Sequence, residues 1–247
     1  MLNDETKRKL RTLNIGEIID AVEDQGKDSV VITLPFEERL QRIVDYLYQV
    51  KYNDKIQRLI KGAKFRFPQA DIRSTFYDGR TLNRDAITEL STCLFVKNKQ
   101  SVVFQGYTGS GKTFLACSIG KEACRKQIKT RYIRMPDLLM EYDDSKLVIG
   151  HTKKLINKYA SIPLLILDEW LMSDVSDEEI HFLFELTERR SDTTSTIFCT
   201  QYSKKDWIKK LGQGVHSEAI VDRFAYNTVW IETGKTNMRE YCAKHKA

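Results

Sequence analysis

Apolar residues recur at helical spacing along the first part of the chain, up to about Pro68. Such residues extend from Leu10 to Val22, and again from Leu40 to Leu59. This spacing places apolar side chains on one side of a helix, so residues 1–68 are expected to form a small all-helical domain. Its second helix is predicted from residue 36 to about residue 61, with one buried apolar stripe. That stripe consists of Leu40, Ile43, Val44, Leu47, Ile56 and Leu59.

The remainder of the chain, residues 69–247, alternates between short apolar runs and helical patterns. After a linker over residues 67–81, helices are predicted at about 83–96, 112–126, from 135 onward, 177–190 and 217–224. Strands are predicted at 101–104, 129–134, 163–167, 194–200 and 228–232. Strands that alternate with helices in this way indicate a central parallel sheet with helices on both faces. The predicted fold class is therefore α/β, with the helical domain in front of it.

Composition and charge are those of an ordinary globular protein and do not identify a binding partner. The chain has 247 residues, 41% of them hydrophobic, and a net charge of +6. This moderate excess permits nucleic-acid binding, but it is equally typical of a slightly basic cytoplasmic protein. No apolar run is long enough to span a membrane, and the charged N-terminus resembles no secretion signal. The five cysteines include no Cys-x-x-Cys pair, so reduced thiols and a cytoplasmic location are expected.

A phosphate-binding loop follows the first predicted strand. Residues 106–113 satisfy the pattern G-x-x-x-x-G-K-[ST], and they lie between the apolar run 102–104 and an amphipathic helix. The glycines allow backbone N–H groups to approach phosphates, and the helix N-terminus adds its dipole. Lys112 is expected to reach the β- and γ-phosphates, and the Thr113 hydroxyl to ligate Mg²⁺. The predicted ATP contacts are Gly106, Tyr107, Thr108, Gly109, Ser110, Gly111, Lys112, Thr113 and Phe114.

Two carboxylates end the strand predicted at 163–167. Asp168 is expected to hold Mg²⁺, and Glu169 to polarise the attacking water. An apolar run that ends in Asp-Glu is also common in a buried strand with a surface turn, but its position after a complete phosphate loop favours catalysis. The glutamate also distinguishes an ATPase from a small-molecule kinase. In such a kinase the substrate hydroxyl is the nucleophile, so no glutamate is needed to activate water. A GTPase would show an N-K-x-D motif, which is absent, so the hydrolysis of ATP to ADP and phosphate is favoured.

Three further residues are candidates for the same site. Gln201 ends the strand predicted at 194–200 and is expected beside the γ-phosphate, although strands often end in a polar residue. Arg223 and Arg239 follow later in the chain. One could be supplied to a neighbouring subunit's nucleotide, and the other could contact the γ-phosphate of its own subunit. From the residues alone, either could also be an ordinary surface arginine.

These motifs together resemble the IstB/DnaC group of AAA+ ATPases, and within it the IstB-like helper ATPases of insertion-sequence transposition. The resemblance covers residues 106–126, 164–169, 195–207, 222–223 and 238–239, together with 36–39, 51–59 and 61–68 of the helical leader. It implies an AAA+ fold and the Walker A and Walker B roles of the loop and the carboxylates. It also implies that Gln201 is sensor I, Arg223 an arginine finger acting in trans, and Arg239 sensor II.

Two departures from the family pattern affect the implied chemistry. Glu169 stands where many relatives have a second aspartate, which is a stronger hydrolytic arrangement. Gln201 stands where the family usually has asparagine, and this leaves the sensing of the γ-phosphate open. The implied catalytic residues are Lys112, Glu169 and Arg223, with Mg²⁺ held by Thr113 and Asp168.

The resemblance also implies partners. Proteins of this kind assemble on duplex DNA as ATP-bound homo-oligomers and assist a cognate transposase in target selection, with little reading of bases. Contacts from lysine and arginine to phosphates would suffice. The candidates in the leader are Lys51, Lys55, Arg58, Lys61 and Lys64, whose alternative interpretation is a solvated helix face. Lys153 and Lys154 form a second candidate stripe, and Arg189 and Arg190 could face a neighbouring subunit or interact with a helix dipole.

Two alternatives stay open at this stage. The first is a replicative helicase loader with the same ATPase core and a different partner. The second is a nucleotide-switched scaffold, in which hydrolysis is incidental and replacement of Glu169 has little effect.

Overall fold

The computed structural model describes residues 2–212, 214–225 and 227–244. The chain divides into two compact units, and the division falls between Arg58 and Leu59. The predicted boundary at residues 68/69 lies later in the chain. The reason for the difference is that Leu59, Ile60, Ala63 and Phe65 pack into a hydrophobic cluster of the second unit.

The first unit is helical, in agreement with the spacing of its apolar residues. It contains α1 (Asp4–Thr12), α2 (Glu17–Lys27), α3 (Ser29–Ile32) and the first part of α4 (Phe36–Ala63). Side chains cap two of these helices. Asn3 accepts a hydrogen bond from the Thr6 N–H, and Asp28 accepts from Val30 and Val31. These bonds satisfy donors that the first turn of a helix leaves without partners.

The prediction of a buried stripe along α4 is wrong. Leu40 and Val44 are 45% and 55% exposed, and among the apolar residues that the structure describes in this unit, only Ile19 and Val31 are buried. A helix buries a stripe only where another element packs along it. Two polar contacts join α2 to α4. Gln25 Nε2 donates to the Arg39 carbonyl oxygen over 2.9 Å, and Lys51 forms an ion pair with Glu17.

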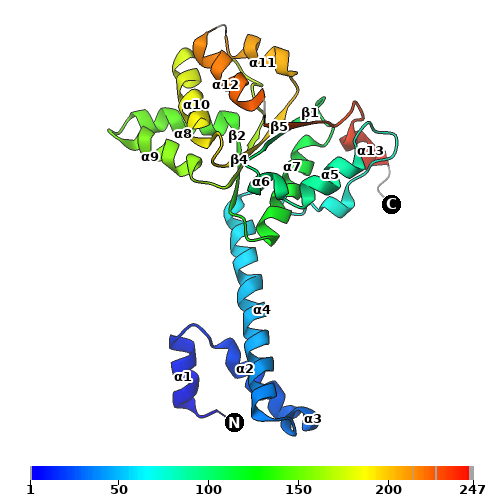
Figure 1. Ribbon diagram of the computed structural model, residues 1–247, viewed down its shortest axis with the longest axis vertical. Helices are drawn as coiled ribbons and strands as arrows, with labels where there is room; N and C mark the ends of the chain where they lie inside the picture. The colour runs from blue at the N-terminus through cyan, green and yellow to red at the C-terminus, as the bar shows by residue number, and fades with distance from the viewer. Residues whose placement is uncertain (1, 213, 226, 245–247) are drawn as a thin grey trace. The chain divides into compact units, whose positions relative to one another are not determined.

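The second unit is built on a five-stranded parallel sheet (Figure 1). Its strands are β1 (Ser101–Gln105), β2 (Thr130–Arg134), β3 (Leu164–Asp168), β4 (Ser195–Thr200) and β5 (Thr228–Glu232), in the order β2-β3-β4-β1-β5. Nearly continuous apolar runs form these strands, as expected where both faces of a sheet are covered. The five strands confirm the sequence prediction.

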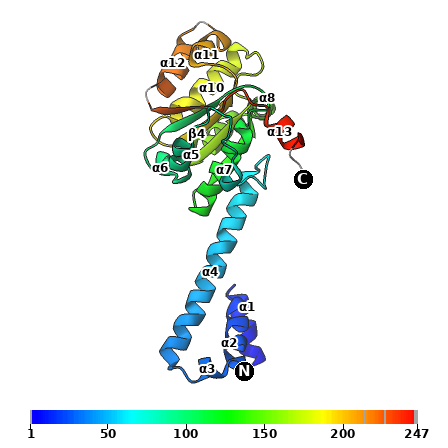
Figure 2. The same ribbon diagram turned by 90° about the vertical axis from the view of Figure 1, so that its right-hand side faces the viewer.

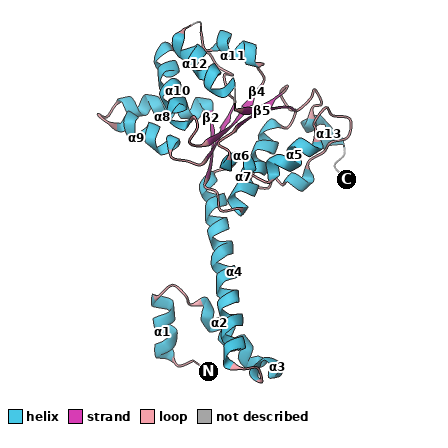
Figure 3. Cartoon of the chain, in the orientation of Figure 1, coloured by secondary structure: helices cyan, strands magenta, loops and turns pink. Residues whose placement is uncertain are grey.

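Alternate residues of each strand enter two separate cores. Val103 belongs to one cluster, whereas Val102 and Phe104 belong to the other. The first face is covered by α8 (Met135–Lys146), α9 (His151–Ala160), α10 (Asp177–Arg190), α11 (Lys204–Lys210) and α12 (Val215–Ala225). The second is covered by α5 (Arg84–Ser91), α6 (Leu94–Lys97) and α7 (Lys112–Arg125). Figures 2 and 3 show the two groups of helices with the sheet between them.

Several helices differ from the prediction in extent or were not predicted. The helix expected over 83–96 is divided into α5 and α6, because Cys93 adopts a left-handed conformation with φ of 60°. The helix expected from residue 135 ends before Gly150, where φ is 79° and α9 begins. A short helix η1 (Ile72–Ser74) lies in the predicted linker, and α13 (Met238–Lys244) follows β5. Neither α11 nor α13 was predicted.

The structure also bears on the state of the cysteines and on membrane-spanning helices. All five cysteines are free thiols, four of them buried. Among the helices that the structure describes, none combines the length and the apolar character needed to cross a membrane.

Candidate functional site

The candidate site lies at the carboxyl ends of three neighbouring strands. The phosphate loop follows β1, Glu169 follows β3 and Gln201 follows β4, which lies between β1 and β3 in the sheet. Parallel sheets bind ligands in this position, outside the carboxyl ends of their strands. The structure therefore brings together three segments that are far apart in the sequence.

The loop before α7 is held in shape by the segment that follows β5. The Met238 N–H donates to the Gly109 carbonyl oxygen over 2.8 Å, and the buried hydroxyls of Ser110 and Thr233 lie 2.7 Å apart. Gly109 has φ of 83°, and a Cβ atom there would lie 2.4 Å from Asn237 Oδ1. Only glycine fits this position without displacing the neighbouring segment.

Lys112 lies over its own loop. Its ammonium group donates to the carbonyl oxygens of Gly106 and Tyr107 over 2.7 and 2.8 Å. Burial lowers the pKa of Lys112, while the carboxylate of Asp168 acts in the opposite direction. An ammonium group has three N–H donors. Two of these donors orient the side chain, and the third can be directed to a phosphate oxygen.

Asp168 is the most firmly held carboxylate of the site. It is 2% exposed, and its Oδ2 accepts from Thr113 Oγ1 over 2.9 Å and from the Tyr132 hydroxyl over 2.8 Å. Its Oδ1 accepts from the N–H of Glu169. Burial, followed by the charge of Asp168, raises the pKa of Tyr132, so the phenol stays neutral and remains a donor. Tyr132 was missed at the sequence level, although it lies on the strand paired with β3.

Thr113 and Asp168 together fit Mg²⁺. A hydroxyl and a carboxylate oxygen that lie 2.9 Å apart provide hard oxygen ligands from two elements. Magnesium sites that serve nucleotides use one or two such protein ligands and leave the other positions to water and phosphate oxygens.

Glu169 is held by two arginines that the sequence did not indicate as site residues. Its Oε1 lies 3.0 Å from Arg66 Nη1, and its Oε2 lies 3.6 Å from Arg134 Nη1. Arg66 Nη1 also approaches Asp168 Oδ2, at 3.9 Å. Arg134 could have been found, because it ends the strand that pairs with β3. Arg66 precedes the predicted linker, and no local pattern connects it with the carboxylates.

Glu169 also has an unusual backbone conformation. Its φ is 57°, in the left-handed region that residues other than glycine seldom adopt. Such strain often occurs at sites where a side chain must take one particular direction. The carboxylate of Glu169 is about one-third exposed and therefore accessible to water.

Gln201 contacts the phosphate loop directly. Its Nε2 donates to Thr108 Oγ1 over 2.8 Å. The side chain therefore lies between the end of β4 and the loop, as expected for a residue beside the γ-phosphate. The sensing role itself stays a prediction.

A cavity of about 480 Å³ adjoins the loop on the side of α13. Its loop side is formed by Gly109 and by residues 111–114, and Phe76 and Met238 contribute apolar walls. The ring of Phe76 also contacts that of Tyr241, with centroids 4.2 Å apart. Cavities of several hundred Å³ with mostly apolar walls suit a flat organic group such as a nucleotide base. Phe76 and Met238 were missed at the sequence level, because neither belongs to a motif.

Arg80 connects the loop with this cavity. Its Nη2 donates to the carbonyl oxygens of Ser110 and Thr233, over 2.6 and 3.0 Å, and its Nη1 donates to that of Phe76. Burial lowers the pKa of Arg80. The guanidinium thus fixes the loop, the end of β5 and one wall of the cavity relative to each other. Nothing in the local sequence distinguishes Arg80 from a surface arginine.

The two arginines predicted from later in the chain lie in different places. Arg239 lines the cavity beside Lys112. Arg223, on α12, forms an ion pair with Glu188 and lies over the ring of Phe184, both on α10. Within the described residues, Arg223 forms no ion pair or hydrogen bond with the phosphate loop of its own chain. The role of each arginine toward nucleotide stays a prediction.

The predicted DNA contacts differ in their surroundings. Lys51 Nζ forms an ion pair with Glu17 Oε1 over 2.6 Å. The other four leader candidates are exposed: Lys55, Arg58, Lys61 and Lys64. Lys153 and Lys154 are exposed in the first turn of α9.

The expectation for Arg190 is wrong, because its side chain is 2% exposed and faces neither a neighbour nor its own helix end. Arg190 instead donates to the carbonyl oxygens of Tyr159, Ile162 and Ser195, and burial lowers its pKa to about 9. Arg189 forms an ion pair with Glu185.

Comparison with known protein families gives one match that covers nearly the whole chain. Residues 8–247 match the family model described as "IstB-like ATP binding protein". The ATP-binding protein of the insertion sequence IS1162 from Pseudomonas fluorescens is 29% identical to this chain. The match covers 81% of this chain and 87% of that protein. The insertion-sequence ATP-binding protein y4uH of Sinorhizobium fredii is 26% identical over 97% of this chain and 96% of its own length.

Solved structures show the same fold at lower sequence identity. The DnaC helicase loader superposes with a TM-score of 0.57 and 20% identity, covering 68% of this chain and 98% of its own. The replication initiator DnaA, bound to AMPPCP and single-stranded DNA, gives a TM-score of 0.57 and 17% identity over 72% of this chain and 55% of its own. These similarities identify the sheet and its helices as an AAA+ fold.

Proposed function

The chain belongs to the family of IstB-like ATP-binding proteins, and from this premise we propose that it is a Mg²⁺-dependent ATPase that assembles on duplex DNA and assists a transposase. The observation that carries the proposal is the arrangement of Thr113, Asp168 and Glu169 beside a complete phosphate loop. Membership of the family accounts for ATP binding. Hydrolysis, DNA binding, assembly and the transposase are the parts proposed here.

The chemistry follows from positions that the structure describes. Backbone N–H groups of the loop and the ammonium of Lys112 bind the phosphates, and this positioning supplies much of phosphoryl-transfer catalysis. Thr113 and Asp168 would hold Mg²⁺, which neutralises charge on the phosphate oxygens. Glu169 orients the attacking water and polarises it.

Glu169 can act on water only when its oxygens are available. In this structure both of its carboxylate oxygens have an arginine within 4 Å. A guanidinium that is hydrogen-bonded to a carboxylate oxygen occupies an acceptor position that would otherwise be available to water. Hydrolysis therefore requires Glu169 to turn away from at least one of the two arginines, and Arg66, which also faces Asp168, is the stronger restraint.

The position of Arg223 supports an oligomer as the active form. Its contacts lie on α10 and α12 rather than at the phosphate loop of its own chain. An arginine supplied by a neighbour would stabilise transition-state charge and make turnover depend on assembly. Exposed basic residues at the end of α4 and on α9 provide contacts for phosphates.

The experiment that tests this function measures retention of duplex DNA on a filter, with ATP and without it, at low salt. Retention that requires ATP is expected, together with ATP turnover that requires Mg²⁺. Absence of ATP-dependent retention would contradict the proposal. A chain that binds DNA and ATP without turnover would be a nucleotide-switched scaffold.

A helicase loader is the second candidate, favoured by a sequence match to the replicative helicase loader DnaC of Escherichia coli. That match is 26% identical and covers 56% of this chain, whereas y4uH matches 97% of it. The extent of the match therefore favours the insertion-sequence relatives. Stable co-purification with a replicative helicase, and none with a transposase, would reverse this preference.

A further inference from the structure

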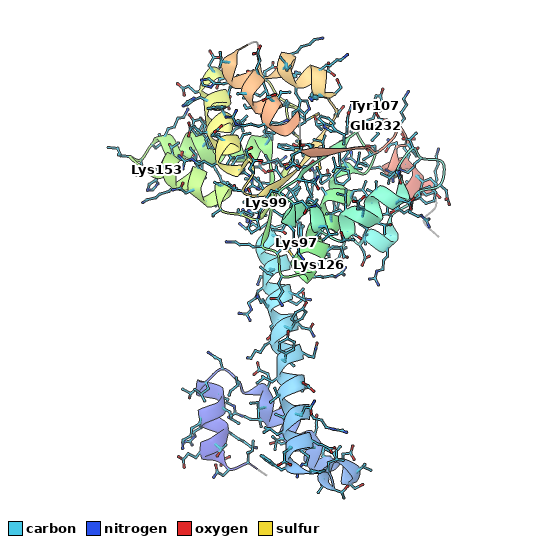
Figure 4. All side chains as sticks on the ribbon, in the orientation of Figure 1. Lys97, Lys99, Tyr107, Lys126, Lys153 and Glu232 are labelled. Atoms are coloured by element: carbon cyan, nitrogen blue, oxygen red, sulfur yellow. The ribbon has the colours of Figure 1, made fainter. Side chains whose placement is uncertain are left out.

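Four exposed lysines lie at the amino-terminal edge of the sheet, opposite the nucleotide site. Lys97 ends α6 and Lys99 precedes β1, while Lys126 follows α7 and Lys129 precedes β2. Figure 4 shows Lys97, Lys99 and Lys126 at one end of the core, away from Tyr107 and Glu232, which mark the carboxyl ends of β1 and β5. These four residues are called the amino-edge lysines.

Within their own segments of the chain, the amino-edge lysines have no acidic neighbour to balance their charge. Residues 92–100 and 126–131 contain basic residues and no acidic one. Among the residues that the structure describes, no carboxylate lies within 4.0 Å of any of the four ammonium groups. The nearest acidic residue on α7, Glu122, forms an ion pair with Arg125. A concentration of unpaired cations raises the local potential and attracts polyanions.

A purely structural role explains only part of this arrangement. Lys97 and Lys126 lie at the C-terminal ends of α6 and α7, where a cation interacts favourably with the helix dipole. Lys99 and Lys129 lie beyond those helix ends, in the turns that lead into β1 and β2. The dipole effect falls off within the last turn of a helix, so it does not account for these two residues.

The spacing of the two lysine pairs suits duplex DNA. One pair precedes β1 and the other precedes β2, and the sheet places β3 and β4 between these strands. Three steps of about 4.8 Å separate the pairs by roughly 14 Å. The major groove of duplex DNA is about 12 Å wide, so the two pairs can each reach one of the backbones that border it.

We propose that the amino-edge lysines bind the two phosphate backbones of duplex DNA. The proposal rests on the DNA binding proposed above and assigns part of it to a surface on the ATPase core. Lysine contacts of this kind position a duplex without reading its sequence. Because the surface lies at the opposite edge of the sheet from the phosphate loop, DNA there leaves the nucleotide site accessible.

The test uses two full-length variants with the same change in net charge. One is Lys97→Gln with Lys99→Gln and Lys126→Gln. The matched control is Lys204→Gln with Lys205→Gln and Lys209→Gln, three exposed lysines of α11. Binding of a duplex in the presence of ATP is measured from low to high salt. The slope of log affinity against log salt is compared with that of the unmodified chain, and circular dichroism and ATP binding verify the fold.

Each phosphate contact contributes about 0.9 to this slope, so removal of three contacts should reduce it by up to about 3. The proposal expects that reduction, with weaker binding at low salt, in the amino-edge variant and a smaller change in the control. Equal slopes for the two variants would overturn it, and so would a variant that loses transposase binding while its DNA binding is unchanged. If the unmodified chain shows no ATP-dependent DNA binding, the proposed function itself fails.

Discussion

Replacement of Arg66 by alanine is expected to accelerate ATP hydrolysis. Arg66 Nη1 lies 3.0 Å from Glu169 Oε1 and 3.9 Å from Asp168 Oδ2. The guanidinium therefore faces both carboxylates and occupies one oxygen of Glu169. Removal of Arg66 leaves Glu169 with only the longer contact to Arg134, at 3.6 Å.

The size of the effect follows from the exposure of the pair. The side chain of Arg66 is 42% exposed and that of Glu169 is 32% exposed, so solvent weakens their attraction. Exposed ion pairs contribute about 0.2–1 kcal/mol. If this free energy must be overcome before Glu169 can act, its removal raises kcat by a factor of up to about 5, since about 1.4 kcal/mol corresponds to a factor of ten.

The assay is steady-state ATP turnover at saturating Mg²⁺, with kcat and KM determined separately. Arg66→Lys retains a charge but offers a shorter side chain, so its kcat should lie between those of the unmodified chain and Arg66→Ala. Arg73→Ala is the matched control, because Arg73 is 81% exposed and pairs with Asp71 rather than with a Walker B carboxylate. The control should leave kcat unchanged.

A decrease in kcat for Arg66→Ala would refute this reasoning. It would mean that the guanidinium orients Glu169 for catalysis instead of restraining it. An unchanged kcat with a raised KM would place Arg66 among the residues that bind nucleotide.

Three further predictions address the nucleotide site and its support. Phe76→Ala removes an apolar wall of the cavity, so the Kd for ATP measured by calorimetry should rise several-fold while kcat at saturation changes little. Tyr132→Phe removes a donor to the buried Asp168; urea unfolding should show a loss of about 1.5–3 kcal/mol, and an unchanged midpoint would contradict the bond. Arg190→Met removes the guanidinium donors to three carbonyl oxygens, and should lower stability by about 3 kcal/mol or more. Arg189→Met, at an exposed pair, should change it by less than about 1 kcal/mol.

The sheet and the phosphate loop could be predicted because their signals are local. An apolar run shows a buried strand, and residues 106–113 form a motif whose spacing is set by the shape of a phosphate group. The strand order was not predicted. In the structure it places Asp168 and Gln201 beside the loop, since parallel strands present their carboxyl ends at one edge.

The residues that were missed act through contacts distant in the sequence. Arg66 meets Glu169 across many intervening residues, and Arg80 reaches Thr233 near the other end of the chain. Periodicity shows which side of a helix is apolar, but it does not show whether another element covers that side. The exposed Leu40 and Val44 on α4 illustrate this difference.

The ATP-bound form of this site is the form that we propose binds DNA. The most direct measurement is duplex-DNA binding by Glu169→Gln with ATP and with ADP, because this change removes the group that activates water and leaves Asp168 and Lys112 in place. ATP turnover is expected to fall by at least tenfold, and the variant should retain DNA with ATP longer than the unmodified chain does. Equal DNA retention with ATP, with ADP and without nucleotide would contradict it.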